Sequence, residues 1–549
     1  MFYSHFFLNL VKSVAMKNFA LFLLFILSIH INAQELPLTF DLRSFNGNNY
    51  VTSIKHQLGG TCWTHGAMAS IEGNLLMNGN WLNAGLDGEP DLSEYHLDWW
   101  NGFNYEFNQD TMANDGSGLE VHYGGDYRVT SAYLSRGEGA IKDTTNYSSW
   151  YYNAPSRKRG GYKYFYVRDI EWYTMDESLN GIETIKRKVM ENGVMGTCMA
   201  YSQDFIYQYM HYQPPTNDMD PNHAIAIIGW NDTIDIGAPE PGAWLCKNSW
   251  GESWGNDGCF WISYYDKWAG RHPEMGAVSL FNAVEPFYDS IYYHDYHGWR
   301  DTKTDITTAL NVFTANDTIE INAVSFFTAI DSVHYSYKIY KAFDGVDLTD
   351  LIAHVDGFIP HSGFHTIDLL SDVIVNKDEN FYLYLELDKG GHPFDRTSEV
   401  PVLLCGDNTR AIVRSTSKPG QSFYKNESDE WIDFYNEGEL DWVHTGNFCM
   451  KALVTNKSES GVGISSTAAK VELKVYPQPA DVELNFRLQN NTQFTGVVSI
   501  VNISGQVIYE SAANAANQLL INTKDWDAGV YFYMIETSSG IQRGKIIKQ

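Results

Sequence analysis

The spacing of apolar residues changes along this 549-residue chain, and that change constrains its fold more than any other feature. A chain of this length exceeds one ordinary core, so we expect two to four domains. Over residues 40–265 the pattern is mixed. Ala67, Ile71 and Leu75 follow helical spacing, whereas residues 224–228 form a short apolar run typical of a buried strand. This region therefore predicts a domain that combines helices with strands.

The next region, residues 286–454, has the spacing of strands throughout. Apolar or aromatic residues alternate with polar ones at 333–339 and 381–387, and Asp, Gly and Pro separate such runs. This pattern favours a β-sandwich. Residues 455–470 are small and polar, as in a flexible linker, and residues 471–549 form a last, small module with short strands.

Residues 1–33 have the pattern of an export signal. Lys17 precedes an apolar run at 19–27, and Ala33 is a small residue suited to cleavage before Gln34. The run is shorter than the roughly 20 residues that a membrane-spanning helix needs. We therefore expect an exported protein whose mature chain has no membrane-spanning segment.

The charge balance argues against two classes of partner. The formal net charge is −29, from 38 Lys and Arg against 67 Asp and Glu. Clustered basic residues bind nucleic acids and anionic membranes, so this balance disfavours both. No group of residues has the spacing of a metal site, and we expect neither a metal nor a cofactor.

Six cysteines are present, and export permits disulfides. Cys405 and Cys449 lie in one β-rich region, so we expect a bond between them. Cys246 and Cys259 flank a predicted hairpin and form a second candidate pair.

Three segments carry residues suited to nucleophilic catalysis. Cys62 stands at the start of the predicted helix, His223 follows 161 residues later, and Asn248 follows 25 residues after that. Taken singly, each has an ordinary structural explanation, because a lone Cys is commonly buried filler and a lone His is commonly a structural residue. Together they have the Cys, His and Asn order of a thiol hydrolase.

These segments resemble the papain family of cysteine peptidases over residues 39–265. Leu92-Ser-Glu94 and Tyr123-Gly-Gly125 resemble further family motifs. The resemblance implies a papain-like α+β fold, with a helical half and a β half, over residues 34–285. It also implies protein or peptide substrates.

The resemblance implies a role for each matched residue. Cys62 is the nucleophile, His223 the general acid and base, and Asn248 the residue that orients the imidazole. Gln57 and the backbone N–H of Cys62 stabilise the oxyanion. The implied substrate-binding residues are Gly124 and Gly125, which pair with an extended peptide, and Trp250, which covers the His–Asn hydrogen bond.

The chain departs from the family pattern near the nucleophile. Four residues separate Gln57 from Cys62, where the family usually has five, so Gln57 is the assignment most affected. The usual Cys two or three places before the nucleophile is missing, and its disulfide with it. His65 replaces a commoner Phe, and we interpret it as a packing variant. The stretch before Cys62 is too short for a papain-type prosegment.

The two later regions resemble known modules as well. Residues 286–454 resemble the lectin-like domain that follows bacterial papain-like domains, and 471–549 resemble a type IX secretion system sorting domain. That second resemblance implies export through the periplasm to the cell surface or the medium, with the type IX secretion machinery as a partner. The matching stretches of the two modules are 311–314, 363–369, 421–423, 431–433 and 448–452, then 475–480, 502–506, 529–531 and Lys545.

We therefore predict a secreted cysteine endopeptidase that works through an acyl-enzyme. Two other interpretations stay open: an inactive peptidase fold that binds a surface through residues 286–454, and another acyl-transfer enzyme. Whether the lectin-like region binds a glycan, and whether cleavage is internal or terminal, also stay open.

Overall fold

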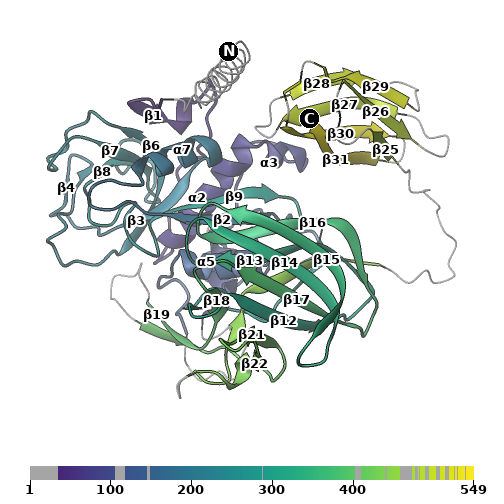
Figure 1. The fold of residues 1–549 in the computed structure, drawn as a ribbon. Coiled ribbons are helices and arrows are strands. Elements are labelled where there is room, and N and C mark those ends of the chain that lie inside the picture. The colour runs from purple at the N-terminus through teal and green to yellow at the C-terminus, as the bar shows by residue number, and fades with distance from the viewer. Residues whose placement is uncertain are drawn as a thin grey trace, which may run out of the picture. The chain divides into compact units, whose positions relative to one another are not determined.

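The computed structural model describes residues 35–104, 118–144, 149–286, 288–401, 410–438 and 442–457, and shorter stretches between 473 and 548 (Figure 1). The chain divides into two compact units after Ser458. The predicted export signal and most of the predicted linker lie outside the described residues. No helix in these stretches is long and apolar enough to cross a membrane.

The helical part of the first unit is built around α2 (Cys62–Met77), which confirms the helix predicted from apolar spacing. α2 is buried on every side from Cys62 to Leu75, as expected for a helix of apolar and small residues within a core. Gly66 allows close packing here, because a Cβ at this position would overlap the Tyr127 hydroxyl. The other helices are η1 (Leu42–Ser44), α3 (Asn80–Asn83), α4 (Glu94–Trp100), α5 (Tyr127–Ser135), α6 (Ser149–Tyr152) and α7 (Ile182–Asn192).

A sheet packs against α2, with strands in the order β2-β9-β3-β6-β7-β8. β6 (His223–Asn231) is buried from His223 to Trp230, which explains its continuous apolar run and confirms the predicted strand. The other strands of this part are β1 (Thr39–Asp41), β2 (Tyr166–Tyr173), β3 (Met195–Met199), β4 (Ile206–Tyr207), β5 (Met210–His211), β7 (Ala243–Lys247), β8 (Cys259–Ser263) and β9 (Ala277–Val284).

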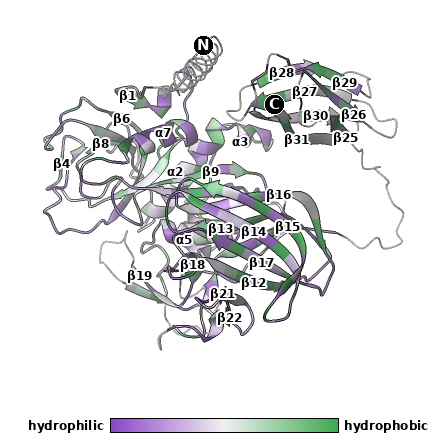
Figure 2. Cartoon of the chain, viewed as in Figure 1, coloured by the Kyte–Doolittle hydropathy of each residue, from purple (hydrophilic) through white to green (hydrophobic). Residues whose placement is uncertain are grey.

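Residues 288–457 place two sheets face to face, as the alternating pattern predicted. One contains β10-β24-β13-β16 and the other β15-β14-β17-β12-β21-β22. Their side chains share one core, where Phe326 of the first sheet and Tyr337 of the second have ring centroids 5.8 Å apart. Buried and more exposed positions alternate along the first half of β14, and hydropathy varies accordingly along these strands in Figure 2.

The elements of this β-rich part are β10 (Ser290–Tyr292), β11 (Asp301–Lys303), β12 (Thr308–Thr314), β13 (Ile319–Thr328), β14 (Val333–Phe343), β15 (Leu348–Ile359), β16 (Gly363–Val375), β17 (Asn380–Leu387), β18 (His392–Asp395), β19 (Ser398–Pro401), β20 (Arg410–Val413), β21 (Ser422–Lys425), β22 (Trp431–Asp433), η2 (Phe434–Asn436), β23 (Asn447–Phe448) and β24 (Met450–Asn456).

The two parts of the first unit share a sheet. Gly363 and Phe364 of β16 pair with Glu171 and Ile170 of β2, so the sheet of the helical part continues into the β-rich part. The apolar core is shared too, because Phe364 lies in the same buried cluster as Trp63 of α2. One continuous core therefore supports both parts.

The second unit is a small β-module with two sheets, β25-β26-β29 and β28-β27-β30-β31. Its core includes Phe486, and the partly buried Tyr533 packs against it with ring centroids 5.0 Å apart. The predicted order of a papain-like α+β region, a β-rich region and a small β-module is confirmed. The strands are β25 (Leu473–Tyr476), β26 (Glu483–Leu488), β27 (Phe494–Asn502), β28 (Val507–Ala512), β29 (Gln518–Asn522), β30 (Gly529–Thr537) and β31 (Gly540–Lys548).

Candidate active site

Cys62 is the first residue of α2, directly after the N-cap residue Thr61. The first N–H groups of a helix have no partner within the helix and form the positive end of its dipole, which favours a thiolate there. Cys62 is 2% exposed and packs in the same apolar cluster as Ala224, the neighbour of His223. α2 packs against β6, and His65 of its first turn lies near His223.

His223 and Asn248 are joined by a hydrogen bond of 2.7 Å between Nε2 and Oδ1. The backbone N–H of Ser249 also donates to that Oδ1, at 2.8 Å, which identifies the atom as an acceptor. Nε2 of His223 must therefore carry a proton, and in the neutral ring Nδ1 is the basic nitrogen. Within the described part of the chain, Nδ1 has no hydrogen-bond partner, so this nitrogen is available for proton transfer.

Burial dominates the electrostatics of His223. It lowers the pKa of the imidazole to about 4, against the opposing effect of the Asn248 hydrogen bond, and the nearby His211 lowers it further. The ring is thus neutral unless a negative charge lies beside it. A thiolate on Cys62 is the charge that would stabilise the imidazolium, so the two ionised forms are expected to arise together.

Trp250 covers the His–Asn pair. Its ring stacks on His223 with centroids 4.3 Å apart and an angle of 23° between the planes. Tyr201 and Trp254 contact Trp250 edge-on, at 4.6 and 5.0 Å, and hold it in place. This aromatic cover keeps water from the hydrogen bond that orients the imidazole.

Gln57 lies next to the same loop but in an altered setting. Its side-chain Oε1 accepts from the Ser249 hydroxyl at 2.7 Å, and its Nε2 donates to the carbonyl of Gly59 at 2.9 Å. One amide N–H of Gln57 is thus bonded to the backbone of the shortened loop, at Gly59. The second N–H of that amide is the one left for an oxyanion.

Gly124 and Gly125 lie beside the loop that precedes the nucleophile. Tyr123, the preceding residue, forms a parallel bridge with Gly60. Gly124 has a φ of +110°, which favours glycine, and a Cβ on Gly125 would lie 2.6 Å from the Trp63 ring. Glycine is therefore needed at both positions to bring this backbone close to Cys62.

A buried charged cluster behind the candidate triad was not predicted. Lys55 contacts Glu72 at 2.8 Å and Glu94 at 2.7 Å, and Lys247 donates to Thr52. The cluster and Asn248 border a cavity of about 20 Å³. In the sequence, Lys55 is close to Gln57 and Lys247 is next to Asn248. That proximity to candidate site residues could have indicated the cluster.

The contacts of His65 agree with its interpretation as a packing variant. Its Nδ1 bonds with the Thr61 carbonyl at 2.8 Å, and burial lowers its pKa to about 3. A ring that stays neutral and buried in this way supports the first turn of α2.

The candidate disulfide between Cys246 and Cys259 is wrong, because both are free thiols. Cys246 pairs with Phe260 and Lys247 with Cys259, so the two cysteines are one residue out of register and face opposite sides of the sheet. Cys449 is also a free, buried thiol, and its expected partner Cys405 lies outside the described residues.

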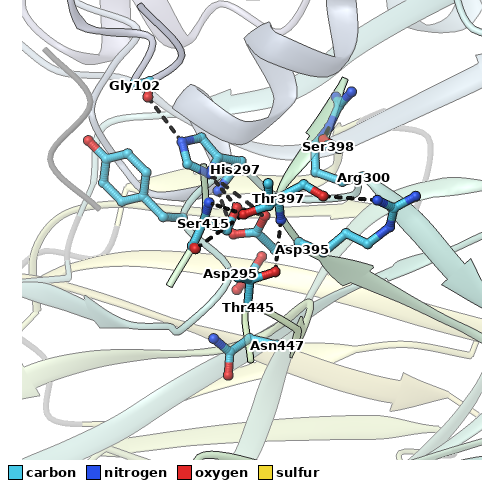
Figure 3. Close-up of polar contacts among 12 residues, drawn as sticks. Gly102, Asp295, His297, Arg300, Asp395, Thr397, Ser398, Ser415, Thr445 and Asn447 are labelled. Atoms are coloured by element: carbon cyan, nitrogen blue, oxygen red, sulfur yellow. Dashed lines mark hydrogen bonds and ion pairs between the residues drawn. The ribbon is translucent and has the colours of Figure 1, made fainter. Parts of the chain in front are cut away.

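A second histidine cluster lies where the β-rich part meets the helical part (Figure 3). Nδ1 of His297 bonds with the Ser415 hydroxyl at 2.8 Å, and Nε2 donates to the Gly102 carbonyl at 3.1 Å. Ser415 donates to Asp395 at 2.7 Å. The only proton of the Ser415 hydroxyl is donated to Asp395, and all three side chains are buried. This Ser, His and Asp group therefore connects two parts of the fold and is no hydrolytic site.

Three family models match the chain: "Papain family cysteine protease" over residues 121–275, "Lectin like domain" over 291–454, and "Secretion system C-terminal sorting domain" over 474–549. The first match includes His223 and Asn248, whereas Cys62 precedes it.

Similar proteins agree with the first match. Cathepsin Z from Onchocerca volvulus is 25% identical over 254 residues, which cover 42% of this chain and 71% of the relative. Zingipain-2 from Zingiber officinale is 27% identical over 228 residues, covering 41% and 86%.

Two solved structures share the fold of the first unit. The clostridial cysteine protease Cwp84 after propeptide cleavage has a TM-score of 0.60 at 22% identity, covering 76% of this chain and 99% of that one. The cysteine protease and lectin-like domains of Cwp84, a surface layer associated protein of Clostridium difficile, give a TM-score of 0.57 at 21% identity, covering 77% and 90%. The sorting domain marks the present chain for export to the cell surface or the medium. The chain thus carries a papain-family cysteine protease domain, followed by a lectin-like domain and a C-terminal sorting domain.

Proposed function

We propose that this protein hydrolyses peptide bonds as a secreted endopeptidase, with Cys62, His223 and Asn248 as its catalytic triad. The carrying observation is the 2.7 Å hydrogen bond from His223 to Asn248, which fixes the ring and leaves Nδ1 as the basic nitrogen. The helix start at Cys62 supplies the second requirement, a place where a thiolate is favoured.

The reaction follows from these positions. Nδ1 of His223 takes the thiol proton, and the Cys62 thiolate adds to the peptide carbonyl. The backbone N–H of Cys62 and the second amide N–H of Gln57 stabilise the resulting oxyanion. His223 then gives its proton to the leaving amine, which leaves an acyl-thioester on Cys62. Water, activated by the neutral imidazole, hydrolyses that thioester and restores the thiol.

Substrate binding is assigned to the backbone of Gly124 and Gly125, which would pair with an extended peptide, and to the rim at Trp250. Tyr123 is 56% exposed beside this backbone, as a residue at a binding edge would be. The substrates are proteins or peptides.

For the whole chain we propose the boundaries stated above: a signal peptide at 1–33, the peptidase domain at 34–285, the lectin-like domain at 286–454, a linker at 455–470 and the sorting domain at 471–549. In this proposal the type IX secretion machinery is the partner that recognises the last domain.

A peptidyl epoxide that alkylates thiolates tests the proposed function. The purified full chain is incubated with the reagent, and the adduct is located by peptide mass spectrometry. We expect one adduct, on Cys62, and none in Cys62→Ala. Cys198→Ala is a matched control, because Cys198 is a buried free thiol of the same core. An unlabelled Cys62 in a folded protein would instead support an inactive peptidase fold that binds through its lectin-like domain.

A further inference from the structure

The loop before the nucleophile lacks the covalent anchor of the family, and the structure shows what lies in its place. The missing Cys belongs two or three places before Cys62, where this chain has Gly60 and Gly59. Both glycines pack against His122. The Gly60 N–H donates to the His122 carbonyl at 2.6 Å, and a Cβ built on Gly59 would lie 3.1 Å from the His122 Cβ.

That second distance is a few tenths of an ångström shorter than the spacing of Cβ atoms in a disulfide, so a small outward shift of one loop would bring it into the disulfide range. Cβ atoms joined through a disulfide lie about 3.5–4.5 Å apart. His122 is thus close enough to Gly59 to occupy the position of a cross-linked partner, although it is not a cysteine.

His122 is itself held firmly. Its Nδ1 donates to Asp98 at 2.5 Å, and its backbone N–H lies 3.4 Å from the other carboxylate oxygen. Asp98 belongs to α4, and its side chain is only 2% exposed. A charge-assisted hydrogen bond to a buried carboxylate is among the stronger and more directional contacts in a protein.

Aromatic rings complete the support of His122. The Tyr151 ring stacks on it with centroids 4.0 Å apart, and Trp99 contacts it edge-on at 5.2 Å. His122 also has a φ of +70°, a left-handed conformation that few residues adopt and that His tolerates better than most. This backbone turn directs its carbonyl at Gly60.

Because of its position in the sequence, His122 can connect the loop before Cys62 with the loop that contains Gly124 and Gly125. It precedes the Tyr123–Gly125 backbone, and Gly60 precedes Thr61 and Cys62. We propose that His122, held by Asp98 and Tyr151, is a positioning residue that replaces the missing disulfide and fixes the nucleophile loop against the glycine loop. We refer to these three residues as the His122 anchor; its role rests on the proposed function.

The anchor should matter most for extended substrates. A peptide must contact the glycine backbone and the Cys62 thiolate at once, so a small shift between the two loops misplaces the scissile bond. A small reagent such as iodoacetamide needs only the thiolate. Loss of the anchor should therefore separate the two reactivities.

The first experiment compares His122→Asn with wild type in the full-length protein. Asn keeps the tolerance for left-handed backbone and removes the ring. We expect kcat/KM for a peptide substrate and the rate of peptidyl-epoxide labelling to fall about 10- to 100-fold, mainly through KM or initial binding. The rate of Cys62 alkylation by iodoacetamide should change less than about threefold, because the dipole of α2 is unaltered.

Two further variants calibrate this result. Asp98→Asn, which keeps the shape of the carboxylate, should show a smaller loss in the same direction. His334→Ala is the matched control, because His334 pairs with Asp388 at 3.2 Å on the surface of the lectin-like part. It should leave all three rates at their wild-type values.

A cross-link provides the rescue. Gly59→Cys combined with His122→Cys should form a disulfide, checked by mass spectrometry, and should restore kcat/KM to within about threefold of wild type. Gly59 has a φ of +65°, so Gly59→Cys alone measures the strain of a side chain there. Wild-type rates in His122→Asn, or a formed disulfide that restores nothing, would overturn the proposal.

Amide hydrogen exchange tests the anchor without relying on activity. Exchange at the Gly60 N–H should accelerate about tenfold or more in His122→Asn and slow again in the cross-linked variant. A wild-type protein that neither cleaves peptides nor reacts with the epoxide would remove the proposed function, while the exchange rates would still decide whether His122 holds the loop. Unchanged exchange would refute the anchor itself.

Discussion

Two buried histidines of this protein have similar surroundings and different chemistry. His223 and His297 are both almost inaccessible, and each has an oxygen acceptor on Nε2, from Asn248 and Gly102 respectively. They differ at Nδ1. In His297 it bonds with Ser415, whose hydroxyl already donates to Asp395. In His223 it has no partner within the described residues.

The difference shows that a Ser, His and Asp set of residues does not make a hydrolase. A general base needs a ring nitrogen that can take the proton of a neighbouring nucleophile, and the ionised form of that nucleophile must be stabilised. The proton of Ser415 is donated to Asp395 instead. Cys62 has the start of α2 to stabilise its thiolate, whereas Ser415 follows the strand β20. Saturated hydrogen bonds give His297 a structural role.

The largest expected difference is in peptide turnover between the variants Cys62→Ala and Ser415→Ala. Cys62→Ala should lower kcat/KM for a peptide substrate by at least about 10⁴-fold, because the acyl-enzyme cannot form. Ser415→Ala should retain wild-type turnover per folded molecule. Turnover measured on purified, folded protein checks both. A Ser415→Ala enzyme as inactive as Cys62→Ala would break the comparison.

The oxyanion contact is the next largest effect. Gln57→Ala should lower kcat by roughly 10²–10³-fold and change KM little, because the interaction matters mainly in the transition state. Asn248→Ala should leave an intermediate activity, since Asn248 orients His223 without forming or breaking bonds. Steady-state kinetics with one peptide substrate checks both.

Near wild-type kcat in Gln57→Ala would mean that another donor serves the oxyanion. The Gly60 N–H already donates to His122 at 2.6 Å, so the Thr61 N–H would be the candidate. The triad would stand in that case.

The structural role of the second cluster predicts a loss of stability. Ser415→Ala removes a buried hydroxyl that bonds with both His297 and Asp395. The polar atoms of these two side chains each lose one hydrogen bond. We expect the free energy of unfolding to fall by about 1–3 kcal/mol. Urea unfolding followed by tryptophan fluorescence measures this, with the exposed Ser428→Ala as control. Equal midpoints for Ser415→Ala and wild type would contradict the assignment.

The pH dependence of stability should be the smallest effect. Burial lowers the pKa of His392 to about 4, although its Nε2 donates to the Thr307 carbonyl. The pKa of an unfolded His is about 6.5, so the unfolded state binds more protons between these values. The stability that neutral His392 contributes is complete above pH 6.5 and is lost as the pH falls toward 4.

The variant His392→Gln keeps a donor for Thr307 and does not titrate. Its unfolding free energy should fall less than that of wild type between pH 7 and pH 5, by up to about 2 kcal/mol. Parallel curves of stability against pH would show that His392 does not contribute.

The spacing of apolar residues correctly predicted individual helices and strands, because burial of one face determines that spacing. The helix at Cys62 and the strand β14 follow from spacing, because a buried face imposes a period of 3.6 or 2. The positions of His223 and Asn248 were predicted from family motifs, and the structure places the two side chains within 2.7 Å.

The wrong or missed features depend on tertiary detail. Whether Cys246 meets Cys259 is decided by a one-residue register, which spacing alone does not set. The contacts of Gln57 with Ser249 and of Gly60 with His122 join segments far apart in the sequence. No periodicity of either segment contains that information.

The pairing of β2 with β16 has a consequence for how the chain folds during synthesis. Glu171 and Ile170 of β2 are bonded to Gly363 and Phe364, almost two hundred residues later in the chain. Until those residues emerge, β2 keeps an open edge and the core around Trp63 lacks Phe364. Contacts this distant are slow to form, and open strand edges invite association with other chains. The peptidase half should therefore reach its native packing only after the lectin-like half has been synthesised, and the two should unfold together.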